Sequence, residues 1–305
     1  MKRPEPFVMF QPTTIREALE LGRENGPGVY FQAGGTDLAI AMKEKGLVPR
    51  CIVDLKKISS LYGIREEGDG TLRIGALTTL REVETSGLVL KKYPLLARSA
   101  AEVGSIQIRN RATIGGNMAN ATPSADVAPA LLVLEAQARI TGLAQERSVP
   151  LSEFFVGPGK TVMTQGTEIL TELVIPPTQG VRGQYIKFSP REMMDLAYIG
   201  VAVALIYVPE DKRCREARIA LGAVSPTPIR ARRAEAILKD KVLTEDLAKE
   251  AGEEASRECK PIGDVRSSAD YRRQMVRVNT TRAILNAAAN PAGRFSWVER
   301  RDKRY

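Results

Sequence analysis

Two pairs of adjacent glycines, each at the end of an apolar run, constrain the fold of this chain more than any other feature. Gly34 and Gly35 follow the run "VYFQA", and Gly115 and Gly116 lie in "RNRATIGGNMANATPSAD". Glycine has no Cβ, so it permits positive φ angles and a close approach of the backbone to a ligand. Each pair alone could be a tight turn. Together they favour two loops that close on one ligand.

The first pair lies where a predicted strand meets a predicted helix. The run "GVYFQA" is typical of a buried strand and "DLAIAMKEKG" has helical spacing, so Gly34, Gly35 and Thr36 form the connecting loop. Exposed backbone N–H groups in such a loop attract an anion, and the dipole of the following helix adds to the attraction. The sequence contains neither the GxGxxG pattern of a Rossmann fold nor the GxxxxGK pattern of a Walker loop.

The second pair lies among short hydrogen-bonding side chains. Such side chains suit a pyrophosphate and a ribose better than an apolar substrate. Asp126 either accepts hydrogen bonds from ribose hydroxyls or caps the predicted helix "DVAPALLVL". The two motifs together predict a dinucleotide ligand without deciding which one. The short polar residues are Thr113, Asn117, Asn120, Thr122 and Ser124.

Composition excludes several classes of site. The chain has no histidine, which excludes Ser-His-Asp hydrolases, zinc hydrolase motifs and histidyl-linked cofactors. Cys51, Cys214 and Cys259 form no CxxC pair and no iron–sulfur ligand run, so we expect free thiols and no metal or cluster in this chain. The formal net charge of +9 comes from dispersed basic residues with only 5% aromatic residues, which argues against nucleic-acid binding. It favours an anionic ligand or an acidic partner.

The sequence also predicts no membrane span. No apolar run approaches the ~18 residues that a transmembrane helix needs. Prolines interrupt the start, "MKRPEPFVMF", where a signal peptide needs a continuous apolar stretch. We therefore expect a cytoplasmic protein.

Composition and periodicity divide the chain into four parts. Residues 1–55 alternate helix and strand, which predicts a small parallel sheet, and residues 56–177 mix helices with strands. Residues 178–289 open with extended segments and continue with helices, which favours an antiparallel sheet with a helical cluster. Residues 290–305 form a basic tail, and our hypothesis is that its segment "RFSWVERRDKRY" docks on a partner.

The order of motifs resembles a known family over about residues 7–289. "AGGTDL" and "TIGGNMANATPSAD" are followed by "SEFFVGPGKT", "EILTELVIP", "KFSPREMMDLAYIGVAVAL" and "ALGAVSPTPIRARRAEAIL". This series resembles the FAD-binding subunit of the molybdenum hydroxylases. The family includes the carbon monoxide dehydrogenase medium subunit and the flavin subunit or domain of xanthine dehydrogenase.

The resemblance implies an α+β fold: a vanillyl-alcohol-oxidase (PCMH-type) FAD-binding domain in two subdomains, plus an α+β C-terminal domain. It implies an FAD-dependent oxidoreductase subunit with non-covalently bound FAD. A partner with [2Fe–2S] clusters would supply electrons, and NAD⁺ or another acceptor would receive them. The expected assembly is a heterotrimer with a small [2Fe–2S] subunit and a large molybdenum-cofactor subunit. The chain has no inserted loop with clustered cysteines and no molybdenum-cofactor domain, so substrate oxidation is expected on another chain.

The resemblance also assigns residues to FAD. The amides of Gly34–Thr36 would bind the pyrophosphate, Thr113–Asn117 would form the second loop, and Asp126 would hold the adenosine end. Leu170 would approach the isoalloxazine, and Lys187 would place positive charge near it. The full predicted set is Phe31, Gln32, Ala33, Gly34, Gly35, Thr36, Asp37, Leu38, Val103, Ile108, Thr113, Ile114, Gly115, Gly116, Asn117, Thr122, Asp126, Ile169, Leu170 and Lys187, with no catalytic residue and no metal ligand.

Several alternatives stay open at this point. Lys187 could instead be an exposed strand lysine. Arg191 and Asp195 could form an ion pair beside the flavin or a solvated loop pair. The whole chain could be a free-standing flavin oxidoreductase acting on its own small substrate, a non-catalytic binding protein whose glycine loops are structural, or a basic RNA-binding module.

Overall fold

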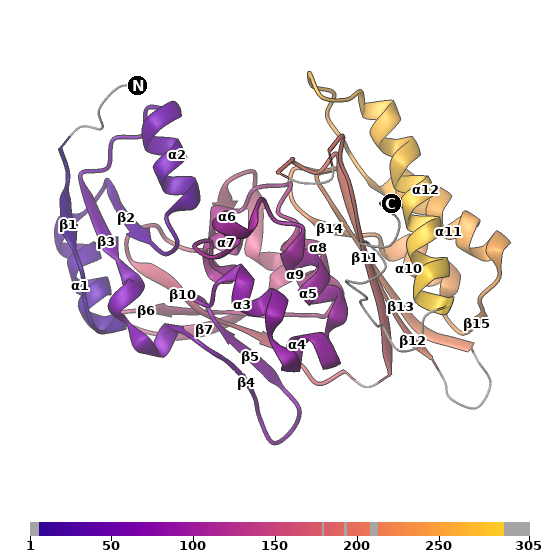
Figure 1. Ribbon diagram of the computed structural model, residues 1–305, viewed down its shortest axis with the longest axis horizontal. Coiled ribbons are helices and arrows are strands. Elements are labelled where there is room, and N and C mark those ends of the chain that lie inside the picture. Colours follow the sequence, from indigo (N-terminus) through magenta and orange to yellow (C-terminus); the bar gives the residue numbers. More distant parts are fainter. Residues whose placement is uncertain (1–5, 179, 192–193, 208–212, 290–305) are drawn as a thin grey trace, which may run out of the picture.

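The computed structural model describes residues 6–178, 180–191, 194–207 and 213–289. Among the described residues, the three sheets of three or more strands follow one another with their helices in chain order along the long axis of the molecule (Figure 1). Within the described ranges, no helix combines the length and apolar character that crossing a bilayer requires. The predicted tail, residues 290–305, lies outside the described residues.

The first subdomain is the small parallel sheet that the sequence predicts, with strand order β1-β3-β2. The Thr14 hydroxyl accepts a hydrogen bond from the Glu17 amide and caps the first helix, which ends at Gly26 with φ 63°. Its elements are β1 (Val8–Phe10), α1 (Ile15–Asn25), β2 (Val29–Gln32), α2 (Thr36–Glu44) and β3 (Cys51–Asp54).

The second subdomain is built on an antiparallel sheet of order β4-β5-β10-β6-β7. Alternate residues such as Leu72, Ile74 and Leu173 share one core with helix residues such as Leu96 and Leu131, so this face is covered by helices. Its strands are β4 (Ile64–Glu66), β5 (Leu72–Gly75), β6 (Gln137–Gly142), β7 (Glu146–Pro150) and β10 (Glu168–Ile175), with the hairpin β8 (Phe155–Gly157) and β9 (Lys160–Thr161). Its helices are α3 (Leu80–Thr85), α4 (Gly87–Lys92), α5 (Pro94–Ala101), α6 (Ile106–Arg109), α7 (Ile114–Asn120), α8 (Val127–Val133) and α9 (Leu151–Phe154).

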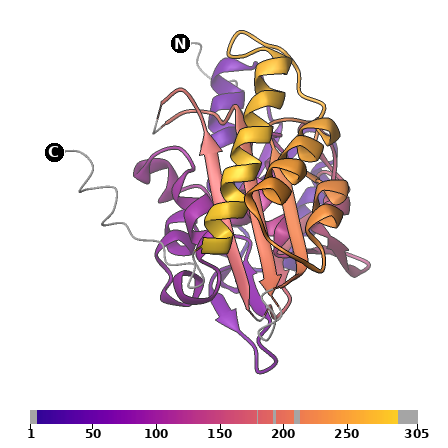
Figure 2. The same ribbon diagram turned by 90° about the vertical axis from the view of Figure 1, so that its right-hand side faces the viewer.

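The C-terminal domain is an antiparallel sheet of order β11-β12-β13-β14, with a short strand, β15, on β13. Its long helices cover one face of the sheet (Figure 2), and α5 and α8 of the second subdomain pack on its strands as well. The strands are β11 (Val181–Phe188), β12 (Ile199–Tyr207), β13 (Arg213–Gly222), β14 (Ile229–Arg230) and β15 (Lys241–Val242). The helices are α10 (Arg232–Leu238), α11 (Glu245–Glu258) and α12 (Ala269–Ala289).

Strand β12 is buried on both faces because two layers cover it. Val201 and Val203 belong to the core under the C-terminal helices, whereas Ala202 and Ala204 belong to the core of the second subdomain. Small residues on that second face let the sheet approach the helices closely: a Cβ built on Gly222 would lie 2.9 Å from Pro129 Cγ of α8.

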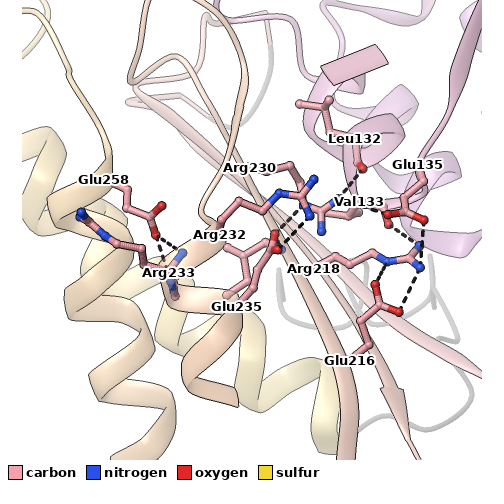
Figure 3. Close-up of polar contacts among 12 residues, drawn as sticks. Leu132, Val133, Glu135, Glu216, Arg218, Arg230, Arg232, Arg233, Glu235 and Glu258 are labelled. Atoms are coloured by element: carbon pink, nitrogen blue, oxygen red, sulfur yellow. Dashed lines mark hydrogen bonds and ion pairs between the residues drawn. The ribbon is translucent and has the colours of Figure 1, made fainter. Parts of the chain in front are cut away.

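Two arginines of the C-terminal domain hold the end of α8 (Figure 3). Arg218 Nη1 donates to the Val133 carbonyl at 3.3 Å and Arg230 Nη1 to the Leu132 carbonyl at 3.3 Å. Arg218 Nη2 also lies 3.1 Å from Glu135 Oε2. Cations at a helix C-terminus satisfy its last carbonyls and complement its dipole, so this cluster joins the C-terminal domain to the second subdomain.

Candidate functional site

A cavity of about 650 Å³ is lined by both glycine motifs. This volume is in the range of small-molecule and cofactor sites, ~300–1,000 Å³. The lining comes from the β2–α2 connection, α7, the β8–β9 hairpin and the start of β10, so the first and second subdomains both contribute to it (Figure 1). Of the predicted set, the cavity is lined by Phe31, Gln32, Ala33, Gly34, Gly35, Thr36, Asp37, Leu38, Thr113, Gly115, Gly116, Asn117, Ile169 and Leu170.

The two glycine motifs lie against each other. A Cβ built on Gly34 would lie 2.0 Å from the Arg111 carbonyl oxygen, and one on Gly116 would lie 3.4 Å from Ala33 Cβ. Real Cβ atoms do not come within 3.0 Å of other heavy atoms, so only glycine fits at Gly34 without displacing the segment before α7. The close approach of the motifs explains why they line one cavity.

The first motif presents unused backbone donors. Gly35 has φ 78° and stands at the N-cap of α2, where it offers no side chain to the first amides of the helix. Within the described residues, no hydrogen bond uses the amides of Gly34, Gly35 or Thr36. These amides and the helix dipole are suited to an anion, as predicted.

The prediction that Thr113–Asn117 form a loop is wrong, because these residues begin helix α7 with Thr113 as its N-cap. The Gly116 amide donates to Thr113 Oγ1 at 3.0 Å, and the Gly115 amide donates to the Ala76 carbonyl at 2.9 Å. The glycines are required for packing: a Cβ on Gly115 would lie 2.5 Å from Ala76 Cβ. A threonine three residues before the second glycine of the pair is an N-cap signal that could have predicted this helix.

Asn117 supplies an unpaired acceptor beside the cavity. Its side chain belongs to the lining, and its Oδ1 is buried without a hydrogen-bond partner among the described residues. A buried polar atom without a partner costs about 1–3 kcal/mol, so this atom is better explained by a ligand that donates to it. Ile169 and Leu170 of β10 line the same cavity with apolar side chains.

Six predicted contacts lie outside the cavity lining, and four of them have no charge. Ile114 is fully buried in the core, Ile108 is exposed on α6, and Val103 packs at the edge of the core. The Thr122 hydroxyl accepts a hydrogen bond from Asn120 Nδ2 at 2.8 Å, and Asn120 itself lines the cavity. Contacts between these residues and FAD stay predictions.

The other two, Asp126 and Lys187, bind each other. Asp126 Oδ2 accepts from Lys187 Nζ at 2.8 Å, and Asp126 Oδ1 accepts from the Tyr185 hydroxyl at 2.8 Å. Lys187 also donates to the Glu102 carbonyl at 2.9 Å. The Asp126 side chain makes no capping hydrogen bond to α8, so the alternative of a helix cap is wrong. The Lys187 side chain is only 5% exposed, so the alternative of an exposed strand lysine is also wrong. Burial raises the pKa of Asp126 to about 6, against the opposing effects of Lys187 and Tyr185.

The predicted Arg191–Asp195 ion pair is present, with Arg191 Nε 3.2 Å from Asp195 Oδ2. The hydrogen bond from Arg191 holds the pKa of Asp195 below its ordinary value. Arg191 is 72% exposed, which makes this the solvated loop pair of the two alternatives.

Comparison with known proteins decides the family. Residues 5–178 match the family described as the FAD binding domain in molybdopterin dehydrogenase, and residues 184–287 match the CO dehydrogenase flavoprotein C-terminal domain. The chain belongs to the FAD-binding subunits of the molybdopterin dehydrogenases. The resemblance inferred from the sequence and the predicted fold class are thereby confirmed.

Similar FAD subunits cover this chain nearly end to end. The carbon monoxide dehydrogenase medium chain of Hydrogenophaga pseudoflava is 34% identical over 286 residues, which are 93% of this chain and 98% of that one. The xanthine dehydrogenase FAD-binding subunit of Escherichia coli O157:H7 is 32% identical over 284 residues, 92% and 96% of the two chains. In the solved carbon monoxide dehydrogenase of Hydrogenophaga pseudoflava, one chain superposes with a TM-score of 0.90 at 34% identity, covering 95% of this chain and all of that one.

The cavity of this FAD subunit fits its cofactor. The amides of Gly34–Thr36 and Asn117 Oδ1 have no hydrogen-bond partner among the described residues, so the amides suit a pyrophosphate and Oδ1 suits an N–H or O–H donor. Ile169 and Leu170 suit a planar apolar ring system. In the part of the chain that the structure describes, no group of three or more Cys, Asp or Glu side chains is placed to hold a metal ion.

Proposed function

We propose that this FAD subunit takes electrons from [2Fe–2S] clusters of a partner subunit and passes them to NAD⁺ or another acceptor. The observation that carries the proposal is the meeting of both glycine motifs at one cavity, in a chain that matches FAD-binding relatives over more than nine-tenths of its length. FAD, when bound, supplies chemistry that exchanges electrons singly or in pairs. The chain itself supplies the placement of the cofactor and its electrostatic surroundings.

Each part of the cavity has a role in this proposal. The amides of Gly34–Thr36 bind the pyrophosphate, Asn117 Oδ1 accepts a hydrogen bond, and Leu170 excludes water from one side of the ring. Asp126 and Lys187 remain candidate contacts, and their mutual ion pair would have to be shared with FAD. We assign no side chain as a general acid or base: the partner's clusters would supply two electrons one at a time, and the proton that accompanies them to NAD⁺ would come from solvent.

The partners in this proposal are a small [2Fe–2S] subunit and a large molybdenum-cofactor subunit. The name of the relative from Hydrogenophaga pseudoflava, a medium chain, supports a place in a larger assembly. Another chain then oxidises the substrate, and this subunit passes the electrons to the final acceptor. We expect the whole assembly in the cytoplasm.

The first experiment is an absorbance spectrum of the purified full-length chain, followed by denaturation and chromatography of any released nucleotide. An oxidised-flavin spectrum with released FAD supports the proposal, and anaerobic bleaching of that spectrum by NADH supports NAD⁺ as the acceptor. Substrate turnover by the chain alone would favour the free-standing oxidoreductase instead. A colourless chain that takes up no added FAD would contradict both, and would favour a non-catalytic binding protein.

A further inference from the structure

The cavity lining has more acidic than basic side chains among the described residues, which is unfavourable for an anionic ligand. Among the described residues, Asp37 and Glu168 are the acidic members of the lining and Lys160 is its basic member. A dinucleotide brings a pyrophosphate with two negative charges into this space. The amides at the N-terminus of α2 supply only about half of a positive charge. A further cation in the cavity would therefore stabilise a ligand of this kind.

The two acidic side chains differ in how far the protein neutralises them. Arg147 Nη2 donates to Glu168 Oε2 at 2.9 Å and to Oε1 at 3.1 Å, and the Thr164 amide donates to Oε2 at 2.8 Å. Although burial opposes it, these hydrogen bonds hold the pKa of Glu168 below its ordinary value. Among the described residues Asp37 has no such partner, and burial raises its pKa, opposed by the positive charge of Lys45.

Lys160 stands on a hairpin that is hydrogen-bonded to the residue after helix α7. It opens β9, which pairs with β8, and the neighbouring Gly159 amide donates to the Ala121 carbonyl at 3.0 Å, just beyond the end of α7. Lys160 is exposed. It takes part in none of the ion pairs found among the described residues, and Glu168 of the lining pairs with Arg147 instead. The described part of the chain thus places a lysine in the cavity lining without an acidic partner.

We propose that Lys160 binds a phosphate of the dinucleotide in this cavity. The proposal deepens the proposed function and depends on it. A lysine is a compact charge on a flexible stem and reaches phosphate as a point contact, which suits a position on a hairpin wall. The first glycine motif and Lys160 would then contact the pyrophosphate from two elements that are 124 or more residues apart in the chain, since Thr36 is the last residue of that motif.

The competing explanation is that Lys160 is a solvated lysine near the carbonyl end of α7, where any cation is mildly favourable. In that case, replacing Lys160 would leave ligand affinity unchanged and would lower only the free energy of unfolding. A ligand with phosphate and a ligand without it therefore separate the two explanations, because only phosphate binding depends on the charge of Lys160.

The experiment compares Lys160→Met, Lys160→Arg and Lys241→Met in the full-length chain. Lys241 is an exposed lysine on β15 in the C-terminal domain, outside the cavity lining, so its variant makes the same change of charge elsewhere. Equilibrium binding of FAD, ADP and riboflavin is measured for each variant at several salt concentrations, and unfolding midpoints are measured in parallel. FAD and ADP carry a pyrophosphate, whereas riboflavin has no phosphate.

We expect Lys160→Met to weaken FAD and ADP binding about tenfold or more, since hydrogen bonds to charged groups are the stronger class. The same variant should weaken the salt dependence of binding and leave riboflavin affinity and the unfolding midpoint unchanged. Lys160→Arg should keep most of the affinity, and Lys241→Met all of it.

Two results would overturn the proposal. One is FAD and ADP affinity in Lys160→Met equal to that in Lys241→Met. The other is an equal loss for FAD, ADP and riboflavin with a lowered unfolding midpoint, which would make Lys160 structural only. If the unmodified chain binds neither FAD nor ADP, the proposed function itself fails, and this result is distinguishable from both others.

Discussion

Gly34→Ala tests the packing that brings the two glycine motifs together. The added Cβ would lie 2.0 Å from the Arg111 carbonyl oxygen and 2.9 Å from Ala112 Cα, against a limit of 3.0 Å for real contacts. The backbone of this segment would therefore have to move by about 1 Å. The Ala112 carbonyl also accepts from the Leu80 amide at 2.8 Å, so the segment cannot move without straining that bond.

The magnitude follows from this clash. Gly34 does not have a left-handed φ, so the cost is steric, and overpacking of this kind destabilises proteins by about 1–3 kcal/mol. Both glycine motifs line the cavity, so a shift of one against the other should also weaken FAD binding. We expect FAD affinity to fall about tenfold, which corresponds to about 1.4 kcal/mol. Urea unfolding of the FAD-free chain gives the first quantity, and titration with FAD gives the second.

Gly68→Ala is the matched control. No heavy atom lies within 4 Å of a Cβ at Gly68, and its φ is not left-handed. This variant should keep its stability within ~0.5 kcal/mol and keep its FAD affinity. If Gly34→Ala and Gly68→Ala have the same unfolding free energy and the same affinity, the inferred contact between the motifs does not control the cavity.

Three further predictions follow from other parts of the structure. Because burial raises the pKa of Asp126 to about 6, folding binds its proton, so stability should fall as pH rises from 4 to 6 and then level off. Relative to Asp126→Asn, this fall should reach up to about 3 kcal/mol in denaturation at stepped pH, and a flat difference would contradict it. Arg218→Met should lower the free energy of unfolding by about 1–3 kcal/mol by freeing the Val133 carbonyl, while Arg257→Met on the surface of α11 should change it by less than ~0.5 kcal/mol. Burial raises the pKa of Cys214 to about 11, so iodoacetamide at pH 8 should label the native chain far more slowly than the urea-unfolded chain, and equal rates would refute its burial.

The sequence by itself determined the elements whose signals are local. Thr14 and Thr244 are N-cap residues directly before amphipathic runs, and the structure places helices α1 and α11 behind them. The valine and alanine run of β12 predicts a buried strand, because such residues fit between two covered faces. The first glycine motif predicts its own conformation, since a glycine between a strand and a helix readily takes the positive φ that Gly35 has.

Only the tertiary structure decided the rest, because it depends on contacts between distant residues. Thr113 marks the start of helix α7 in the sequence, but a helix of seven residues has too little internal hydrogen bonding to be stable alone, so it forms only where the Ala76 carbonyl of another segment accepts one of its first amides. The pairing of Asp126 with Lys187 spans 61 residues, and the arginine cap on α8 joins segments 85 residues apart. The cavity itself exists only once the first and second subdomains have packed. Local patterns thus predict which residues are candidates for binding a dinucleotide, and long-range packing decides which of them line the cavity.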